Sequence, residues 1–204
     1  GWLADRFGTR KVYFTAIVFF TLGSLLCAAS QSLGQLVASR VIQGAGGAML
    51  MPVGRLTILR SFPQHRLLPA LSFVAIPAMV GPMIGPVLGG WLSEQLSWHW
   101  VFLINIPVGI VGAIATRTYL IDKRNDERAP FDGVGYGLLA FGMAAISLAL
   151  DGLSHRAMSH APIVLMLVFG LISIVTYWIR ATRQANPLFS PALFRIHTFS
   201  IGLL

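Results

Sequence analysis

The stretch Gly81–Gly90 reads Gly-Pro-Met-Ile-Gly-Pro-Val-Leu-Gly-Gly and lies within an apolar run from Pro69 to Leu92. In water this run would be a poor helix, because each interior proline removes a backbone hydrogen bond and each glycine costs roughly 1 kcal/mol against alanine. In a lipid bilayer the backbone must satisfy its own hydrogen bonds, and the run is long enough to cross one. The stretch therefore predicts a membrane-spanning helix that contains helix breakers.

The glycines of this stretch recur at Gly81, Gly85 and Gly89, so they form a stripe of small residues along one helix face. Such a stripe lets another helix approach closely. The prolines Pro82 and Pro86 make the same span easier to bend. The spacing alone leaves two interpretations, which are a hinge that lets the helix rock against its partners and a static packing seam.

The composition excludes an ordinary soluble domain, because 55% of the 204 residues are hydrophobic and only 11% are charged. We expect an all-α, polytopic membrane protein in a lipid bilayer. The apolar runs predict six membrane spans and the start of a seventh at Phe199. The six spans are expected at Val12–Ala29, Leu36–Leu59, Pro69–Leu92, Val101–Thr116, Val134–Leu150 and Ala161–Ile179. Because the sequence begins inside a motif and ends in an apolar run, we also expect an internal piece of a longer protein.

The net charge of +8 does not indicate a nucleic-acid partner, because the basic residues lie in alternate loops and form no compact patch. Thirteen of the 15 Lys and Arg residues fall on one side of the expected spans. Arg156 alone falls on the other side, and Arg40 lies within a span. Basic loops stay on the cytoplasmic side of a membrane. The pattern therefore predicts a multi-pass plasma-membrane protein with its basic loops in the cytoplasm.

Arg40 is the one charged residue well inside an apolar run. An arginine at the centre of a membrane helix costs roughly 2.5–3.5 kcal/mol, so it usually faces a protein cavity and has a partner. Positions 40, 43, 44 and 47 share one helical face and combine a cation, an amide and two glycines. We expect a functional arginine that faces a cavity. The competing interpretation is an arginine that snorkels to the outer interface, about one helical turn away.

The remaining charged residues carry weaker indications. Asp5 with Arg6 and Arg10 is either an ion-paired cytoplasmic latch or a solvated turn. Asp132 and Asp151 flank the fifth expected span, where helix capping is the default explanation.

No catalytic or metal-binding constellation is visible in the sequence. Cys27 is the only cysteine, which excludes an internal disulfide. The five histidines are scattered over both sides of the membrane, so no metal site is expected. No grouping of serine, histidine and acid suggests a hydrolase, and the chain is not expected to be an enzyme. Trp91, Trp98 and Trp100 are typical of aromatic residues at a membrane interface.

Four motifs carry a resemblance to a known family. Gly1–Lys11 resembles the signature cytoplasmic loop of the major facilitator superfamily, and Arg40–Gly47 resembles its fourth-helix motif. Gly81–Gly90 resembles the fifth-helix motif of its drug–proton antiporters. Trp98–Gly109 resembles the start of the sixth helix in the 14-helix branch of those antiporters. Because four motifs occur in the right order and at the right spacings, the chain is identified as a member of this branch, of the EmrB/QacA type.

The resemblance also implies a domain organisation. Residues 1–11 would be the cytoplasmic signature loop, 12–116 four spans of an N-terminal bundle, and 117–131 a cytoplasmic linker. Residues 132–180 would be the two extra linker spans of the 14-helix branch. Residues 181–204 would form a cytoplasmic segment and the start of the C-terminal bundle.

The same resemblance implies a role for each motif. The latch loop would comprise Gly1, Asp5, Arg6, Gly8, Arg10 and Lys11. The helix-four motif beside the proton path would comprise Arg40, Gln43, Gly44 and Gly47. The antiporter hinge, which also seals against leak, would comprise Gly81, Pro82, Gly85, Pro86, Gly89 and Gly90. The start of helix six would comprise Trp98, Trp100, Asn105, Pro107 and Gly109.

The implied function is proton-coupled efflux of amphipathic drugs or metabolites by alternating access, in a monomer of a bacterial inner membrane. Protons would be the coupling ion, and no cofactor is expected. No expected span carries a central carboxylate, so the proton-binding acid is expected outside this sequence. A facilitator transporter of another solute class is the main alternative, because it would share the loop and Arg40 without needing the proline–glycine helix. A membrane-embedded enzyme or channel would need a catalytic cluster or repeated pore-lining polar residues.

Overall fold

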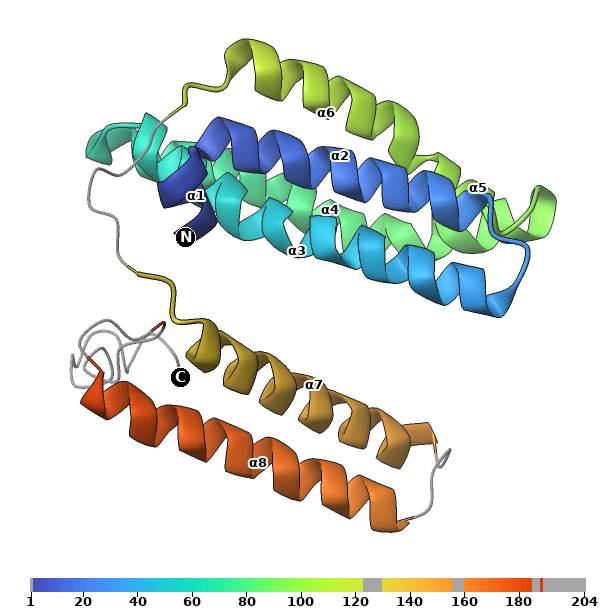
Figure 1. The fold of residues 1–204 in the computed structure, drawn as a ribbon. Helices are drawn as coiled ribbons and strands as arrows, with labels where there is room; N and C mark the ends of the chain where they lie inside the picture. Colours follow the sequence, from blue (N-terminus) through green and yellow to red (C-terminus); the bar gives the residue numbers. More distant parts are fainter. Residues whose placement is uncertain (1, 123–129, 156–159, 185–187, 189–204) are drawn as a thin grey trace. The chain divides into compact units, whose positions relative to one another are not determined.

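The computed structural model describes residues 2–122, 130–155, 160–184 and 188, and every regular element in these ranges is an α-helix. The chain divides into two compact units, Gly1–Arg128 and Ala129–Leu204. The first unit contains α1 (Trp2–Phe7), α2 (Thr9–Ala28), α3 (Leu33–Ser61), α4 (Gln64–Gln95), α5 (Trp100–Leu103) and α6 (Asn105–Tyr119). The second contains α7 (Gly133–His155) and α8 (His160–Arg183) (Figure 1).

The expected all-helical fold is confirmed. Within the described ranges, six helical stretches are long and apolar enough to cross a membrane, with α5 and α6 together forming one of them. Each corresponds to one of the six expected spans. Several expected features lie outside the described residues, namely Gly1, the seventh span, and the segment from Asn186 to His197 apart from Leu188.

The segment before the first span is helical, which corrects the expectation of an irregular loop. Its six residues in α1 contain neither glycine nor proline, and Ala4 is fully buried against Val12 and Val53. This contact stabilises a turn of helix that would be marginal on its own. Gly8 then separates α1 from α2 with a φ of 93°, a conformation that glycine adopts without steric cost.

Local signals set both ends of α3. The hydroxyl of Ser32 accepts a hydrogen bond from the Gln35 N–H at 3.4 Å, so the helix begins at Leu33, three residues before the expected start. Phe62 is extended, with φ −106° and ψ 140°, because it precedes Pro63. The proline therefore ends α3, and α4 begins directly after it.

α2 lies between α3 and α6 in the first unit (Figure 1). Its contact with α3 is close enough to involve the backbone. A Cβ placed on Gly46 would lie 2.5 Å from the backbone nitrogen of Phe20, and one on Gly23 would lie 2.5 Å from the Cα of Gln43. On the other side, Gly109 of α6 packs against the Thr21 side chain. Glycine is thus required wherever α2 meets its neighbours most closely.

α4 remains helical through four internal prolines, which are Pro69, Pro77, Pro82 and Pro86. A proline cannot donate to the carbonyl four residues earlier, so α4 lacks four of its ladder hydrogen bonds. The helix has little support from its own unit, because Leu92 is its only buried residue. The helix is thus the span with interior breakers that the sequence predicts, but the close neighbour that the glycine stripe predicts is not present in this unit.

α5 and α6 form one span with a break at Ile104, whereas the sequence suggested a continuous helix from Val101. Pro107 explains the position of the break. Its ring clashes with the carbonyl four residues earlier, at Leu103, where α5 ends. Pro107 itself lies in the first turn of α6, where a missing N–H costs little.

The second unit is a hairpin of α7 and α8. The helices cross closely at Gly142 and Gly170, because a Cβ on either glycine would lie 3.1 Å from the carbonyl oxygen of the other. The Ser173 hydroxyl also donates to the Leu138 carbonyl at 2.9 Å. Small residues and an interhelical hydrogen bond are the usual means of helix association in lipid.

Candidate functional site

An ion pair links α1 to the end of α3. The Arg60 guanidinium donates to the Asp5 carboxylate, and both side chains are partly exposed. The sequence pointed to Arg6 and Arg10 as partners of this aspartate, but Arg6 instead lies over the Trp2 ring, 5.1 Å from its centroid. Arg60 was missed because its position, 55 residues away, shows no signal in the sequence.

Asp122 forms a second contact at the same end of this unit. Its carboxylate accepts a hydrogen bond from the backbone N–H of Arg10 at 3.2 Å, in the first turn of α2. An anionic group at a helix N-terminus is favourable, because the first N–H groups have no partner within the helix. A Cβ on Gly8 would collide with this carboxylate, so the glycine makes room for it. Asp122 thereby joins the end of α6 to the start of α2.

Arg40 belongs to a polar network that joins α3 to α2. Its guanidinium donates to the Gln43 side-chain oxygen at 3.1 Å. The Gln43 amide nitrogen donates to the Ser24 hydroxyl at 2.6 Å. Gln43 is only 5% exposed and Ser24 is fully buried, so the hydrogen bond between them lies inside the helix pair. Arg40 is exposed and lies two turns inside α3, whose start is earlier than expected.

The rest of the helix-four motif divides between two environments. Gly47 packs against the Phe20 ring. A Cβ built on Gly47 would lie 3.4 Å from the nearest ring carbon. Gly44 has no atom within 4 Å of its Cβ position, so the four motif residues do not all pack against a neighbouring helix. The closest approaches of α3 to α2 are at the motif residue Gln43 and at Gly46, which is not in the motif.

The start of helix six lies at the turn before α5 and in the first turns of α6. Trp98 stacks on His99 at 3.8 Å and meets the edge of Phe102 at 6.0 Å. Trp100 is exposed, and Asn105 begins α6. The Phe102 ring lies beneath the Arg40 guanidinium, whose central carbon is 4.5 Å from the ring centroid. The helix-four and helix-six motifs therefore meet.

The hinge motif lies on the uncovered face of α4. No atom of the first unit lies within 4 Å of a Cβ built on Gly81, Gly85, Gly89 or Gly90. The close helix approach that the stripe predicts is therefore not found within this unit. Pro82 and Pro86 are exposed as well. Within the first unit the stripe is therefore uncovered.

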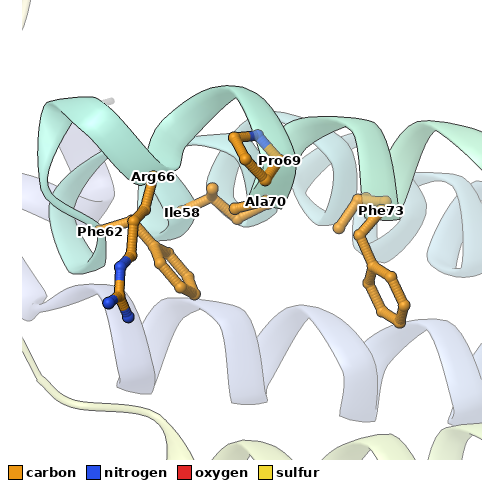
Figure 2. Close-up of a pocket in the computed structure, with 7 residues that line it drawn as sticks. Ile58, Phe62, Arg66, Pro69, Ala70 and Phe73 are labelled. Carbon is orange, nitrogen blue, oxygen red and sulfur yellow. The ribbon is translucent and has the colours of Figure 1, made fainter.

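An apolar groove lies between the end of α3 and the start of α4. It has a volume of about 570 Å³, within the range of small-molecule sites. It is lined by Ile58, Phe62, Arg66, Pro69, Ala70, Phe73 and Val74. Figure 2 shows the rings of Phe62 and Phe73 pointing to the same side of α4, with Arg66 beside Phe62. The groove thus offers aromatic and aliphatic contacts with one cation at its end.

In the second unit, Asp132 caps α7, as expected. Its carboxylate accepts a hydrogen bond from the Gly135 N–H at 3.0 Å and forms an ion pair with Arg180 at 3.4 Å. The Gly135 N–H lowers the pKa of this carboxyl below its ordinary value of 3.8, and Arg180 acts in the same direction against the effect of burial. The charged form of Asp132 therefore stabilises the hairpin.

This pKa shift gives a pH dependence. Because the pKa is lowered on folding, the stabilisation is complete above pH 3.8 and is lost as the pH falls through the lowered value. Asp132→Asn keeps a capping side chain but removes the charge, and it should lower the melting temperature of the full-length protein by a few degrees at pH 7. Thermal unfolding at pH 7 and near pH 3 measures the effect. If the melting temperatures of the wild type and Asp132→Asn differ by the same amount at both pH values, the charge of Asp132 does not contribute to stability.

Residues 1–133 match the Major Facilitator Superfamily. The chain belongs to the Major Facilitator Superfamily. The match covers the latch loop, the helix-four motif, the hinge motif and the start of helix six. This superfamily consists of membrane transporters and not of enzymes. Together with the six apolar helices, it establishes a multi-pass membrane protein.

Relatives within the superfamily cover the whole chain. It is 51% identical over 205 residues to a "Putative multidrug resistance protein MdtD" of Pectobacterium carotovorum subsp. carotovorum (strain PC1). Proteins of the same name from Serratia proteamaculans (strain 568) and Escherichia coli O17:K52:H18 (strain UMN026 / ExPEC) are each 50% identical over 203 residues. The chain spans 42–43% of the length of these relatives. The motifs predict a protein close to MdtD, and this prediction is confirmed.

Proposed function

We propose that the full-length protein exports amphipathic drugs or metabolites in exchange for protons. The observation that carries this proposal is the Arg40 network. In it an exposed cation two turns inside a membrane helix donates to Gln43, and Gln43 donates in turn to the buried Ser24 of the neighbouring helix. Ionisable residues at such depth usually serve a substrate or proton path. Arg40 would adjust the protonation of a carboxylate elsewhere in the protein. The names of the relatives support drugs as the substrate class.

The proposed setting is the bacterial inner membrane, with the basic loops in the cytoplasm and the protein acting as a monomer. Two contacts support this orientation. The Asp5–Arg60 and Asp122–Arg10 contacts bring the start of α2 and the ends of α3 and α6 to the same end of the first unit. These ends carry most of the basic residues of the unit, as the positive-inside rule requires of a cytoplasmic face. The same two contacts would form the cytoplasmic latch.

The proposed cycle is alternating access, in which one bundle rocks against the other. The first unit would supply four helices of the N-terminal bundle, and the α7–α8 hairpin would be the extra helix pair of the 14-helix branch. The open glycine stripe on α4 supports this cycle, because its bendable face is available to a helix of the other bundle. The stripe would act as hinge and seal.

The groove between α3 and α4 would receive the apolar part of an amphipathic substrate. Its aromatic rings suit a hydrophobic body, and Arg66 would lie near the polar end of the molecule. Such a site binds many related compounds, because apolar contacts set few directional requirements.

Growth of an efflux-deficient bacterium that produces the full-length protein tests the proposal. The protein should raise resistance to several amphipathic compounds, and a protonophore should abolish the gain. Resistance that persists with the protonophore would contradict proton coupling. No change for any compound in a broad panel would favour a facilitator transporter of another solute class, which would share the latch loop and Arg40.

A further inference from the structure

Phe102 is in direct contact with Arg40, although the two residues come from different spans. The guanidinium carbon lies 4.5 Å from the ring centroid, within the range of a cation–π interaction. Phe102 is only 5% exposed and is the one buried residue of α5. The ring is thus fixed, whereas the guanidinium lies at the end of a flexible side chain.

Two groups define the position of the guanidinium. The Phe102 ring covers one face of the Arg40 guanidinium. At the edge of the guanidinium, an N–H donates to the Gln43 side-chain oxygen at 3.1 Å. Gln43 is itself fixed by its 2.6 Å hydrogen bond to Ser24. Because the ring and the amide belong to different helices, the guanidinium holds this position only while Phe102 of α5 stays beside Arg40 of α3.

α5 packs against α2 and α4, and two further features flank Phe102 within its own span. The Trp98 ring meets the edge of Phe102 at 6.0 Å on the side of the preceding turn. On the other side, the break at Ile104 separates α5 from α6. A movement of this four-residue segment would therefore carry the ring away from Arg40 without requiring α3 to move.

We propose that Phe102 is a positioning residue for Arg40, which clamps the guanidinium against Gln43 and couples it to the α5–α6 span. The local contact stands on the geometry alone, and its consequence for transport rests on the proposed function. The chemistry requires an aromatic face. A side chain of similar volume without a ring, such as methionine or leucine, would fill the space but leave the guanidinium free.

The rate at which phenylglyoxal modifies Arg40 in the purified full-length protein tests the clamp. The modified Arg40 peptide is quantified by mass spectrometry. Removing the ring should speed modification of Arg40 by roughly two- to thirtyfold in Phe102→Leu and Phe102→Met, the range that a cation–π contact allows. Phe102→Tyr retains the aromatic face and should react at the wild-type rate. The Arg55 peptide is the internal control, because this exposed arginine lies on the same helix, away from α5.

Two results would overturn the proposal. One is a wild-type Arg40 rate in both Phe102→Leu and Phe102→Met. The other is a Phe102→Tyr rate that equals theirs, because loss of the phenylalanine shape alone would then explain the change. The leucine and methionine variants differ in shape, so one can replace the other if it folds poorly. The assay does not require the protein to transport anything. If the protein transports nothing but the Phe102 variants change the modification rate as expected, the proposed function is wrong and the clamp still holds.

Discussion

Arg40→Ala in the full-length protein should lower proton-coupled efflux by roughly ten- to a hundredfold while leaving its amount in the membrane unchanged. Hydrogen bonds to a charged group contribute about 1.5–3 kcal/mol, and each 1.4 kcal/mol corresponds to a factor of ten in rate. Arg40 supplies such a bond to Gln43 and also rests on Phe102. Because Arg40 is exposed, its loss leaves no cavity that would prevent folding.

Dye efflux from energised cells measures the effect, together with the amount of protein in the membrane. Arg55→Ala is a matched control, because it removes an exposed arginine from the same helix outside the Arg40 network. The control should export dye at the wild-type rate. Normal efflux from Arg40→Ala would eliminate the role proposed for this residue.

Gly85→Leu should block transport without preventing the protein from folding. Within the first unit the new side chain meets no atom, because nothing lies within 4 Å of the Cβ position of Gly85. A helix of the other bundle that docks on the stripe would collide with it. Overpacking of this kind costs typically 1–3 kcal/mol, and transport should fall by roughly tenfold or more.

Gly34→Leu is the control for the added volume. Gly34 also has no neighbour within 4 Å of its Cβ position, but it lies at the start of α3 and outside all four motifs. It should leave efflux unchanged. If Gly85→Leu also transports at the wild-type rate, the stripe is neither a hinge nor a seal, and only passive packing remains.

The sequence predicts the helices of this protein well, because the bilayer restricts a long apolar run to one structure. Hydrophobic length predicts α4 despite its four prolines. Local signals also explain helix ends, such as the Ser32 cap and the stop at Pro63. The helicity of α1 was not predicted, because it depends on burial of Ala4 against two other helices.

The contacts of the candidate site could be predicted only in part. The helical spacing pairs Arg40 with Gln43, which the structure brings together at 3.1 Å. Spacing within one helix cannot show that Phe102 lies against Arg40 or that Asp122 caps α2, because these contacts join distant parts of the chain. Nor can it show which glycines are covered. Gly46 meets a neighbouring backbone, whereas Gly85, in an equally glycine-rich stretch, meets none.

Transport by the purified full-length protein in lipid vesicles tests the central claim most directly. The measurement is the movement of a fluorescent amphipathic dye after a pH gradient is imposed across the vesicle membrane. Proton-coupled export predicts that the dye accumulates against its own gradient, in the direction opposite to proton flow, and that a protonophore stops it. Dye movement that is the same with and without the pH gradient would contradict the account.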